Sequence, residues 1–219
     1  MKLHRLWILV KKDWLAEGRQ QQHLYGMGIY ALCTIFVIYL SAGQLDAIAW
    51  NALFWITQLF IVVNAVVKSF VGEAKGRLLY YYTIAHPLEY LGSKMLLNLG
   101  YMASLGLISL LVFMLLLGNP VQNFWLFAGI NLLGGLGLSL VFTMLSAIAS
   151  KARQQASLIA ILGFPLIIPQ LVLLVRLSKL AYGEVFKEGA AWQLTGMLLG
   201  LDALVLVMAA ILFPFLWKD

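Results

Sequence analysis

The sequence predicts an all-α integral membrane protein with six transmembrane helices. Of its 219 residues, 63% are hydrophobic and only 11% are charged. Soluble domains are about 45–50% apolar and about 25% charged. The mean hydropathy is +0.92. A soluble fold of this length cannot hide so much apolar surface, so the composition excludes a soluble enzyme, a nucleic-acid-binding domain and a disordered chain.

Six continuous apolar windows are long enough to cross a bilayer as helices. A hydrocarbon core of about 30 Å needs about 20 residues at about 1.5 Å each, and the windows are too long and continuous for the strands of a barrel. One membrane domain, 1–219, is expected, with spans at about 24–42, 48–67, 95–117, 124–149, 156–177 and 194–215. Pro165 and Pro169 interrupt the fifth window and predict a kink or local rearrangement there.

The positive charges predict how the chain is oriented in the membrane. With the N-terminus in the cytoplasm, only three of the 15 Lys and Arg residues fall outside, namely Arg176, Lys179 and Lys187. The other twelve fall inside, so both termini are expected to be cytoplasmic. A cleaved signal peptide is the alternative, but the first apolar stretch, residues 6–10, is short and runs directly into Lys11 and Lys12.

Residues 1–20 are expected to form an interfacial amphipathic helix. Leu3, Trp7, Val10 and Trp14 recur at spacings of four, three and four, which places them on one apolar stripe. The basic residues of this segment can meet anionic lipid headgroups. The alternative is a plain basic tail that only fixes the topology.

The cytoplasmic segment 68–94 combines charged residues with an apolar and aromatic run at 78–82. So many apolar groups are unusual in a solvated loop and need a partner, either the headgroup layer or another protein. Residues 77–85 can form a short helix that ends at His86, since a residue before proline is pushed out of the helical region.

The sequence lacks motifs for catalysis and for metal binding. It has no HExxH zinc pair, no GxSxG elbow and no GxxxxGK[ST] phosphate loop. All its histidines, His4, His23 and His86, fall on the cytoplasmic side of the predicted topology. We therefore expect a non-catalytic chain without a metal site. The glycines at 134–137 and at 196 and 200 lie within predicted spans, where we expect them to allow close packing of helices.

Asp202 is an acid inside the last predicted span, where a charged carboxylate is costly. One interpretation is functional, as a proton relay, a counter-ion or a substrate contact. The other is structural: a protonated acid that is hydrogen-bonded to a neighbouring helix or lines a wet cavity. Asn51, Gln58 and Asn131 are the polar partners that the spans suggest.

Two blocks of the sequence are distinctive in combination with six spans. One holds Glu73, Gly76, Leu78, Leu79, Pro87 and Lys94, and the other is the fifth-span sequence around Pro165 and Pro169. With these blocks, the layout resembles the membrane subunits of type-2-like ATP-binding-cassette (ABC) exporters. Within them it resembles the haem exporter protein B family, CcmB, the permease subunit of cytochrome c maturation.

The resemblance implies a subunit of an ATP-driven haem exporter, or of a complex that releases a haem-loaded chaperone, for c-type cytochrome biogenesis. Its partners would be a cytoplasmic ABC ATPase (CcmA-like), other cytochrome c maturation membrane subunits, a haem chaperone and a second copy of the chain. Haem would be the handled ligand, ATP would act only through the ATPase, and the location would be the bacterial inner membrane. The ATPase-coupling residues would be Glu73, Gly76, Arg77, Leu78, Leu79, Tyr82 and Pro87.

Three other functions are compatible with the residues alone. An ABC permease for another substrate would share the whole layout. A stand-alone secondary transporter would use Asp202 as its coupling site, although the spans show no inverted repeat. A membrane scaffold for assembly would transport nothing. An adjacent ATPase gene or co-purification with an ATPase separates the permease from the other two classes.

The predicted orientation can be tested by cysteine labelling. A cysteine placed at Gln122 or Glu184 should be labelled by an impermeant reagent in intact cells. A cysteine at Lys75 or Gln155 should be labelled only after permeabilisation. Labelling at Lys75 in intact cells would contradict the predicted orientation.

Overall fold

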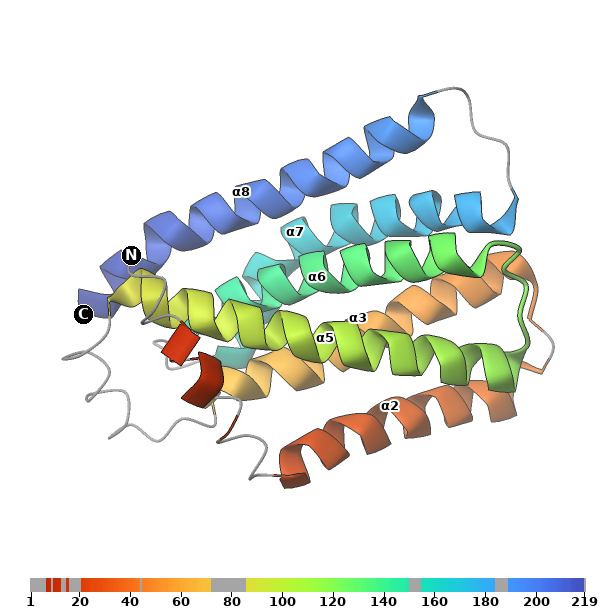
Figure 1. Ribbon diagram of the computed structural model, residues 1–219, viewed down its shortest axis with the longest axis horizontal. Helices are drawn as coiled ribbons and strands as arrows, with labels where there is room; N and C mark the ends of the chain where they lie inside the picture. Colours follow the sequence, from red (N-terminus) through yellow and green to blue (C-terminus); the bar gives the residue numbers. More distant parts are fainter. Residues whose placement is uncertain are drawn as a thin grey trace.

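The computed structural model describes residues 21–43, 45–71, 86–149, 155–183 and 189–218, together with 7–8, 10–12 and 15 near the N-terminus. Six long helices dominate these residues (Figure 1). They are α2 (Gln21–Ala42), α3 (Ala47–Val71), α5 (Pro87–Leu117), α6 (Phe124–Ala149), α7 (Gln155–Ser178) and α8 (Ala190–Lys218), and a 3₁₀ turn, η1 (Lys179–Tyr182), follows α7. All six are long and apolar enough to span a membrane, which confirms the predicted fold class.

Helix α5 begins at Pro87, well before the predicted start of the third span at Met95. His86 is extended (φ −72°, ψ 141°), and its Nδ1 atom accepts a hydrogen bond from the backbone N–H of Leu88 at 3.4 Å. Proline then occupies the first helical position, where its missing N–H costs nothing. Residues 87–94 of the expected cytoplasmic segment 68–94 therefore belong to α5, and residues 68–71 to α3.

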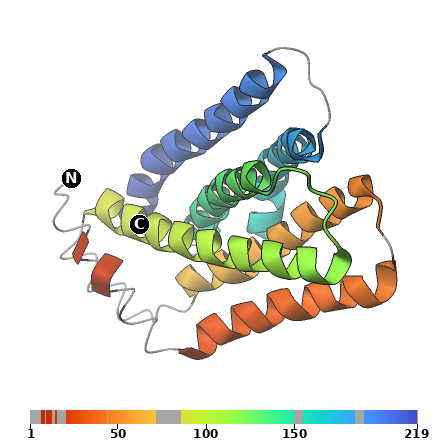
Figure 2. The ribbon, with the colours of Figure 1, turned by 45° about the vertical axis from the view of Figure 1, so that its right-hand side comes forward.

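Helix α6 is the centre of the bundle. It contacts α3, α5, α7 and α8, and 72% of its span is buried, compared with 17% for α2. Figures 1 and 2 both place α2 and α8 at opposite edges of the molecule, with α6 between them. The edge helices expose large apolar side chains, as expected for surfaces that face lipid.

The glycines of α6 allow neighbouring helices to approach closely. A Cβ atom on Gly134 would lie 2.5 Å from the Trp55 ring and 2.7 Å from Leu174 Cδ2. A Cβ on Gly137 would lie 2.5 Å from Asp202 Oδ1. The expected packing role is therefore confirmed for these two positions, because only a glycine leaves room for α3, α7 and α8 at these contacts.

The expected packing role of Gly196 and Gly200 is wrong within the described part of the chain. Both are exposed, and no heavy atom of another residue there comes within 4 Å of a Cβ built on either. Helix α8 instead turns Leu198, Asp202 and Val205 towards the bundle. The small residues lie on the opposite face because the larger apolar side chains fill the core.

A cluster of aromatic rings fixes the end of the bundle at which α6 begins. Trp50 of α3 lies edge-on to Phe113 of α5 at 4.9 Å and to Phe127 of α6 at 5.5 Å between ring centroids. Tyr182 of η1 lies edge-on to Phe127 at 5.9 Å. Such pairs add about 0.5–1.5 kcal/mol each beyond the area they bury. Four elements are thereby joined at this end.

Helix α7 continues through both of its prolines. Pro165 is exposed, and Pro169 is half-buried. Each proline leaves one carbonyl of the preceding turn without its usual donor, and membrane helices absorb this loss by local adjustment. The sequence interruption therefore does not end the helix.

Replacing Gly134 with alanine should destabilise the bundle. The added Cβ overlaps Trp55 and Leu174, and such overpacking costs about 1–3 kcal/mol, or about 2–12 °C in Tm for a chain of this size. Gly129→Ala is the matched control on the same helix, because its Cβ meets nothing within 4 Å. Thermal unfolding in detergent measures both, and equal Tm values would contradict the packing role.

Candidate functional site

Asp202 lies inside the bundle, where α6, α7 and α8 meet. Its side chain is 9% exposed, and its Oδ1 atom accepts a hydrogen bond from Nε2 of Gln170 at 3.1 Å. Gln170 itself is 1% exposed. A carboxyl group in hydrocarbon is costly unless a polar group meets it, and the Gln170 amide supplies that contact from the neighbouring helix.

The backbone of Gly137 forms the wall of this site on α6. A Cβ atom there would meet both the amide of Gln170 and the carboxyl of Asp202. The glycine therefore lets two polar side chains from different helices come together in the interior of the membrane domain. We refer to Gly137, Gln170 and Asp202 as the carboxyl–amide site.

The polar partners expected for Asp202 from the sequence are wrong. Asn51 donates from Nδ2 to the carbonyl oxygen of Val175 at 2.9 Å, and Gln58 donates from Nε2 to Ser109 Oγ at 2.6 Å. Asn131 faces Gly106 of α5, with its side-chain amide within 3.4–3.8 Å of a Cβ built there. Asn51 and Gln58 therefore hold α3 to α7 and to α5, whereas Asn131 faces α5 without a hydrogen bond among the described residues.

Gln170 is not among the partners that the sequence predicted for Asp202, although a signal for it exists. Gln170 is the sole polar side chain between Ile161 and Val175, and it directly follows Pro169. A lone polar residue in an apolar span calls for a partner, just as Asp202 does. The two unexplained polar residues of the last two spans could therefore have been paired with each other.

The chemistry open to the carboxyl–amide site is proton binding and hydrogen bonding. The Oε1 atom of Gln170 is buried and makes no hydrogen bond within the described residues, so it can accept one more. The carboxyl can accept the Gln170 N–H whether or not it carries a proton. The site contains no nucleophile–base pair, so its geometry supports a structural, proton-binding or ligand-contacting role.

The other predicted site residues do not join this site. Glu73, Gly76, Arg77, Leu78, Leu79 and Tyr82 lie outside the described residues. Pro87 is the first residue of α5, and Pro165 and Pro169 lie within α7. Most of the expected interfacial helix, 1–20, also lies outside the described residues, so that helix and the coupling helix stay predictions.

Within the described residues, no group of three or more His, Cys, Asp or Glu side chains gathers to hold a metal ion. His86 is exposed and caps α5. We therefore assign no resident metal site within the described residues.

Comparison with known proteins identifies the family. The family model described as CcmB protein matches residues 4–215. The chain belongs to the CcmB family. Searches of curated proteins and of solved structures returned no match. Family membership makes this CcmB chain a membrane component of a haem exporter for cytochrome c maturation, a multi-pass protein of the inner membrane, with haem as the substrate that the exporter handles.

Substitutions of Asp202 should separate the two interpretations of the carboxyl–amide site. We expect Asp202→Asn to assemble, because an amide oxygen can still accept from Gln170. Asp202→Lys should fail to assemble, because it places a cation against the amide donor of Gln170 in hydrocarbon. A double-mutant cycle of Asp202→Leu and Gln170→Leu, read by thermal unfolding, should give a coupling of about 0.6–1.7 kcal/mol.

Activity of the same variants decides whether the site also has a functional role. Loss of cytochrome c maturation in an assembled Asp202→Asn variant would support a proton-binding or ligand-contacting role. Full activity in Asp202→Leu would contradict both a proton relay and a required hydrogen bond.

Proposed function

We propose that this CcmB chain is the permease subunit of an ATP-driven complex for c-type cytochrome biogenesis, which exports haem or releases a haem-loaded chaperone. The family match over residues 4–215 is the observation that carries the proposal. The sequence contains no nucleotide-binding loop, so ATP hydrolysis belongs to a separate cytoplasmic ABC ATPase (CcmA-like). The chain itself is non-catalytic, and both its termini lie in the cytoplasm.

The coupling segment lies between α3 and α5 and supplies the ATPase contact. Its residues Leu78, Leu79 and Tyr82 form the apolar face that a partner must cover. In a helix over 77–85, Leu79 and Tyr82 are three residues apart and Leu78 and Tyr82 four, so all three gather on one side. Glu73, Gly76, Arg77 and Pro87 flank this face.

The start of α5 is packed firmly enough to transmit a movement of the coupling segment. Glu89, Tyr90 and Lys94 are each buried in its first two turns. Tyr90 stacks on Phe213 of α8 at 6.3 Å, and Lys94 Nζ lies 5.9 Å from the centre of the Tyr90 ring. Force on the segment would therefore reach α8 directly.

The same region also connects α5 to α6. A second core cluster joins apolar side chains of α5, α6 and α8 at the end of the bundle where α5 begins: Tyr90, Leu91, Met95, Val141, Met144, Leu145, Ala147, Val205, Ala209 and Phe213. Helix α8 continues from this cluster to Asp202. We propose that ATP-driven movement of the coupling segment shifts α8 against α6 and so acts on the carboxyl–amide site.

Substitution of the apolar coupling face should weaken ATPase binding. Burying such a side chain contributes about 1.5–3 kcal/mol, and forcing a charge into the contact costs more. Leu79→Glu and Tyr82→Glu should therefore weaken binding by one to two or so orders of magnitude, at about 1.4 kcal/mol per tenfold. The measurement is retention of the ATPase by the purified full-length chain in detergent.

Ile84→Glu serves as the control, because residue 84 lies on the opposite side of the predicted helix from Leu78, Leu79 and Tyr82. It should retain the ATPase, and all three variants should elute from size exclusion like the wild type. Wild-type retention by both Leu79→Glu and Tyr82→Glu would refute the coupling face. A membrane scaffold or a secondary transporter would then be the better explanation.

A further inference from the structure

An apolar groove opens where α6 and α8 begin and α7 ends. It has a volume of about 340 Å³. Its walls are formed by Trp125 and Gly129 of α6, by Leu177 and Leu180 around the end of α7, and by Trp192 and Thr195 of α8. Among the described residues of the lining, Thr195 alone carries a hydroxyl, which donates to the carbonyl oxygen of Ala191 within its own helix.

The dimensions of the groove match a single extended hydrocarbon chain. Its α6 wall runs from Trp125 to Leu133, about 12 Å at about 1.5 Å per residue. The groove offers about 340 Å³ along that length, which is room for part of one extended hydrocarbon chain.

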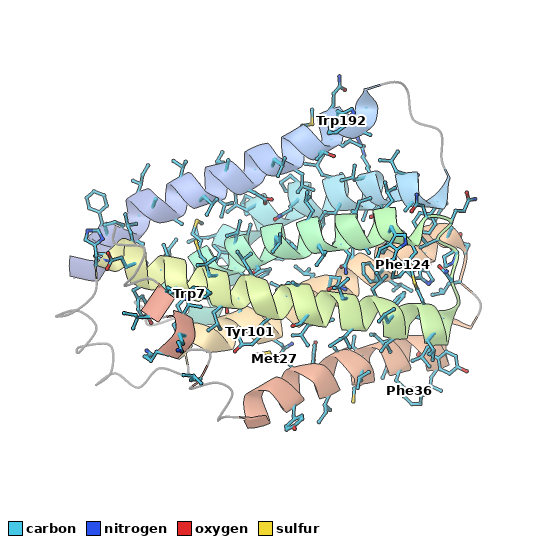
Figure 3. The ribbon with its side chains drawn as sticks, in the orientation of Figure 1. Trp7, Met27, Phe36, Tyr101, Phe124 and Trp192 are labelled. Atoms are coloured by element: carbon cyan, nitrogen blue, oxygen red, sulfur yellow. The ribbon has the colours of Figure 1, made fainter. Side chains whose placement is uncertain are left out.

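The depth of the groove also matches a lipid chain. Trp125 and Trp192 are each 82% exposed near the starts of their helices, and tryptophans at such positions mark the headgroup level. Figure 3 shows Trp192 at the same end of the bundle as Phe124, the first residue of α6. From this level, about 12 Å of groove covers most of one leaflet, which is about 15 Å thick.

The lining distinguishes a lipid chain from haem. Haem iron is held by His, Cys, Met or Tyr side chains, and the described residues that line the groove include none of these. Its walls are aliphatic and aromatic, so they offer dispersion contacts and no ligand for a metal.

A cation is available for the headgroup. Arg176 is exposed in the last turn of α7, and it directly precedes Leu177 of the groove wall. Near the end of a membrane helix, an arginine extends towards the interface, where phosphate groups lie. A basic residue at this level adds affinity for an anionic lipid.

We propose that this groove is a binding site for an anionic phospholipid of the outer leaflet, with one acyl chain between α6 and α8 and its phosphate near Arg176. The bound chain would fill the space between the starts of these helices and so support α8 at the end where it stands apart from the bundle in Figure 1.

Native mass spectrometry of the full-length chain, titrated with dioleoyl-phosphatidylglycerol in detergent, tests this proposal. The wild type should bind one lipid tightly. Gly129→Phe should weaken this binding by at least about tenfold, because the new ring occupies the groove. A Cβ on Gly129 meets nothing within 4 Å, so the variant should fold.

Gly196→Phe is the matched control, since Gly196 is an equally open glycine outside the groove lining. It should bind like the wild type. Arg176→Gln should weaken binding of the anionic lipid by about fivefold and leave binding of dioleoyl-phosphatidylcholine unchanged.

Three outcomes would overturn the proposal. The first is equal affinity of wild type and Gly129→Phe. The second is equal loss in Gly129→Phe and Gly196→Phe, which would indicate only general lipid adsorption. The third is displacement of the lipid by haemin in the wild type, which would assign the groove to haem. An unchanged affinity in Arg176→Gln would overturn the headgroup contact.

Discussion

The close approach of three helices to the backbone of α6 is the constraint on which the bundle depends. Between helices in a membrane there is no hydrophobic driving force, because lipid tails are as apolar as the side chains, so packing and hydrogen bonds must hold them together. Gly134 admits Trp55 and Leu174, and Gly137 admits Gln170 and Asp202. One short stretch of α6 therefore sets how near α3, α7 and α8 can come.

Hydrogen bonds between polar side chains also hold the helices of the bundle together. Because hydrocarbon offers no hydrogen-bond partners, several polar side chains of the bundle find donors or acceptors on neighbouring helices. Trp55 Nε1 donates to Ser178 Oγ at 2.8 Å, and Asn98 Nδ2 donates to Thr143 Oγ1 at 3.0 Å. The pair formed by Gln170 and Asp202 differs from these because one member is an acid. A change of protonation at Asp202 can therefore alter a contact between α7 and α8.

The two ends of the bundle are built differently, and the difference suits an exporter subunit. The end at which α5 begins is tightly packed, with buried Glu89 and Lys94 close to the predicted ATPase contact. At the other end, α8 leaves an open apolar groove against α6 and α7. Under the proposed coupling, a movement that entered at the packed end would be carried by the helices to the open end, where a small shift of α8 would widen or close the groove.

The sequence by itself determined the class of protein, the six spans and the family resemblance, because each depends on composition or on residues close together in the chain. It also marked His86-Pro87 as a helix boundary and Gly134 and Gly137 as packing positions. Only the tertiary structure decided that Asp202 pairs with Gln170 and not with Asn51, Gln58 or Asn131. It likewise decided that Gly196 and Gly200 face away from the bundle. These outcomes depend on how each helix is rotated about its axis, and side chains distant in the sequence fix that rotation when they pack together.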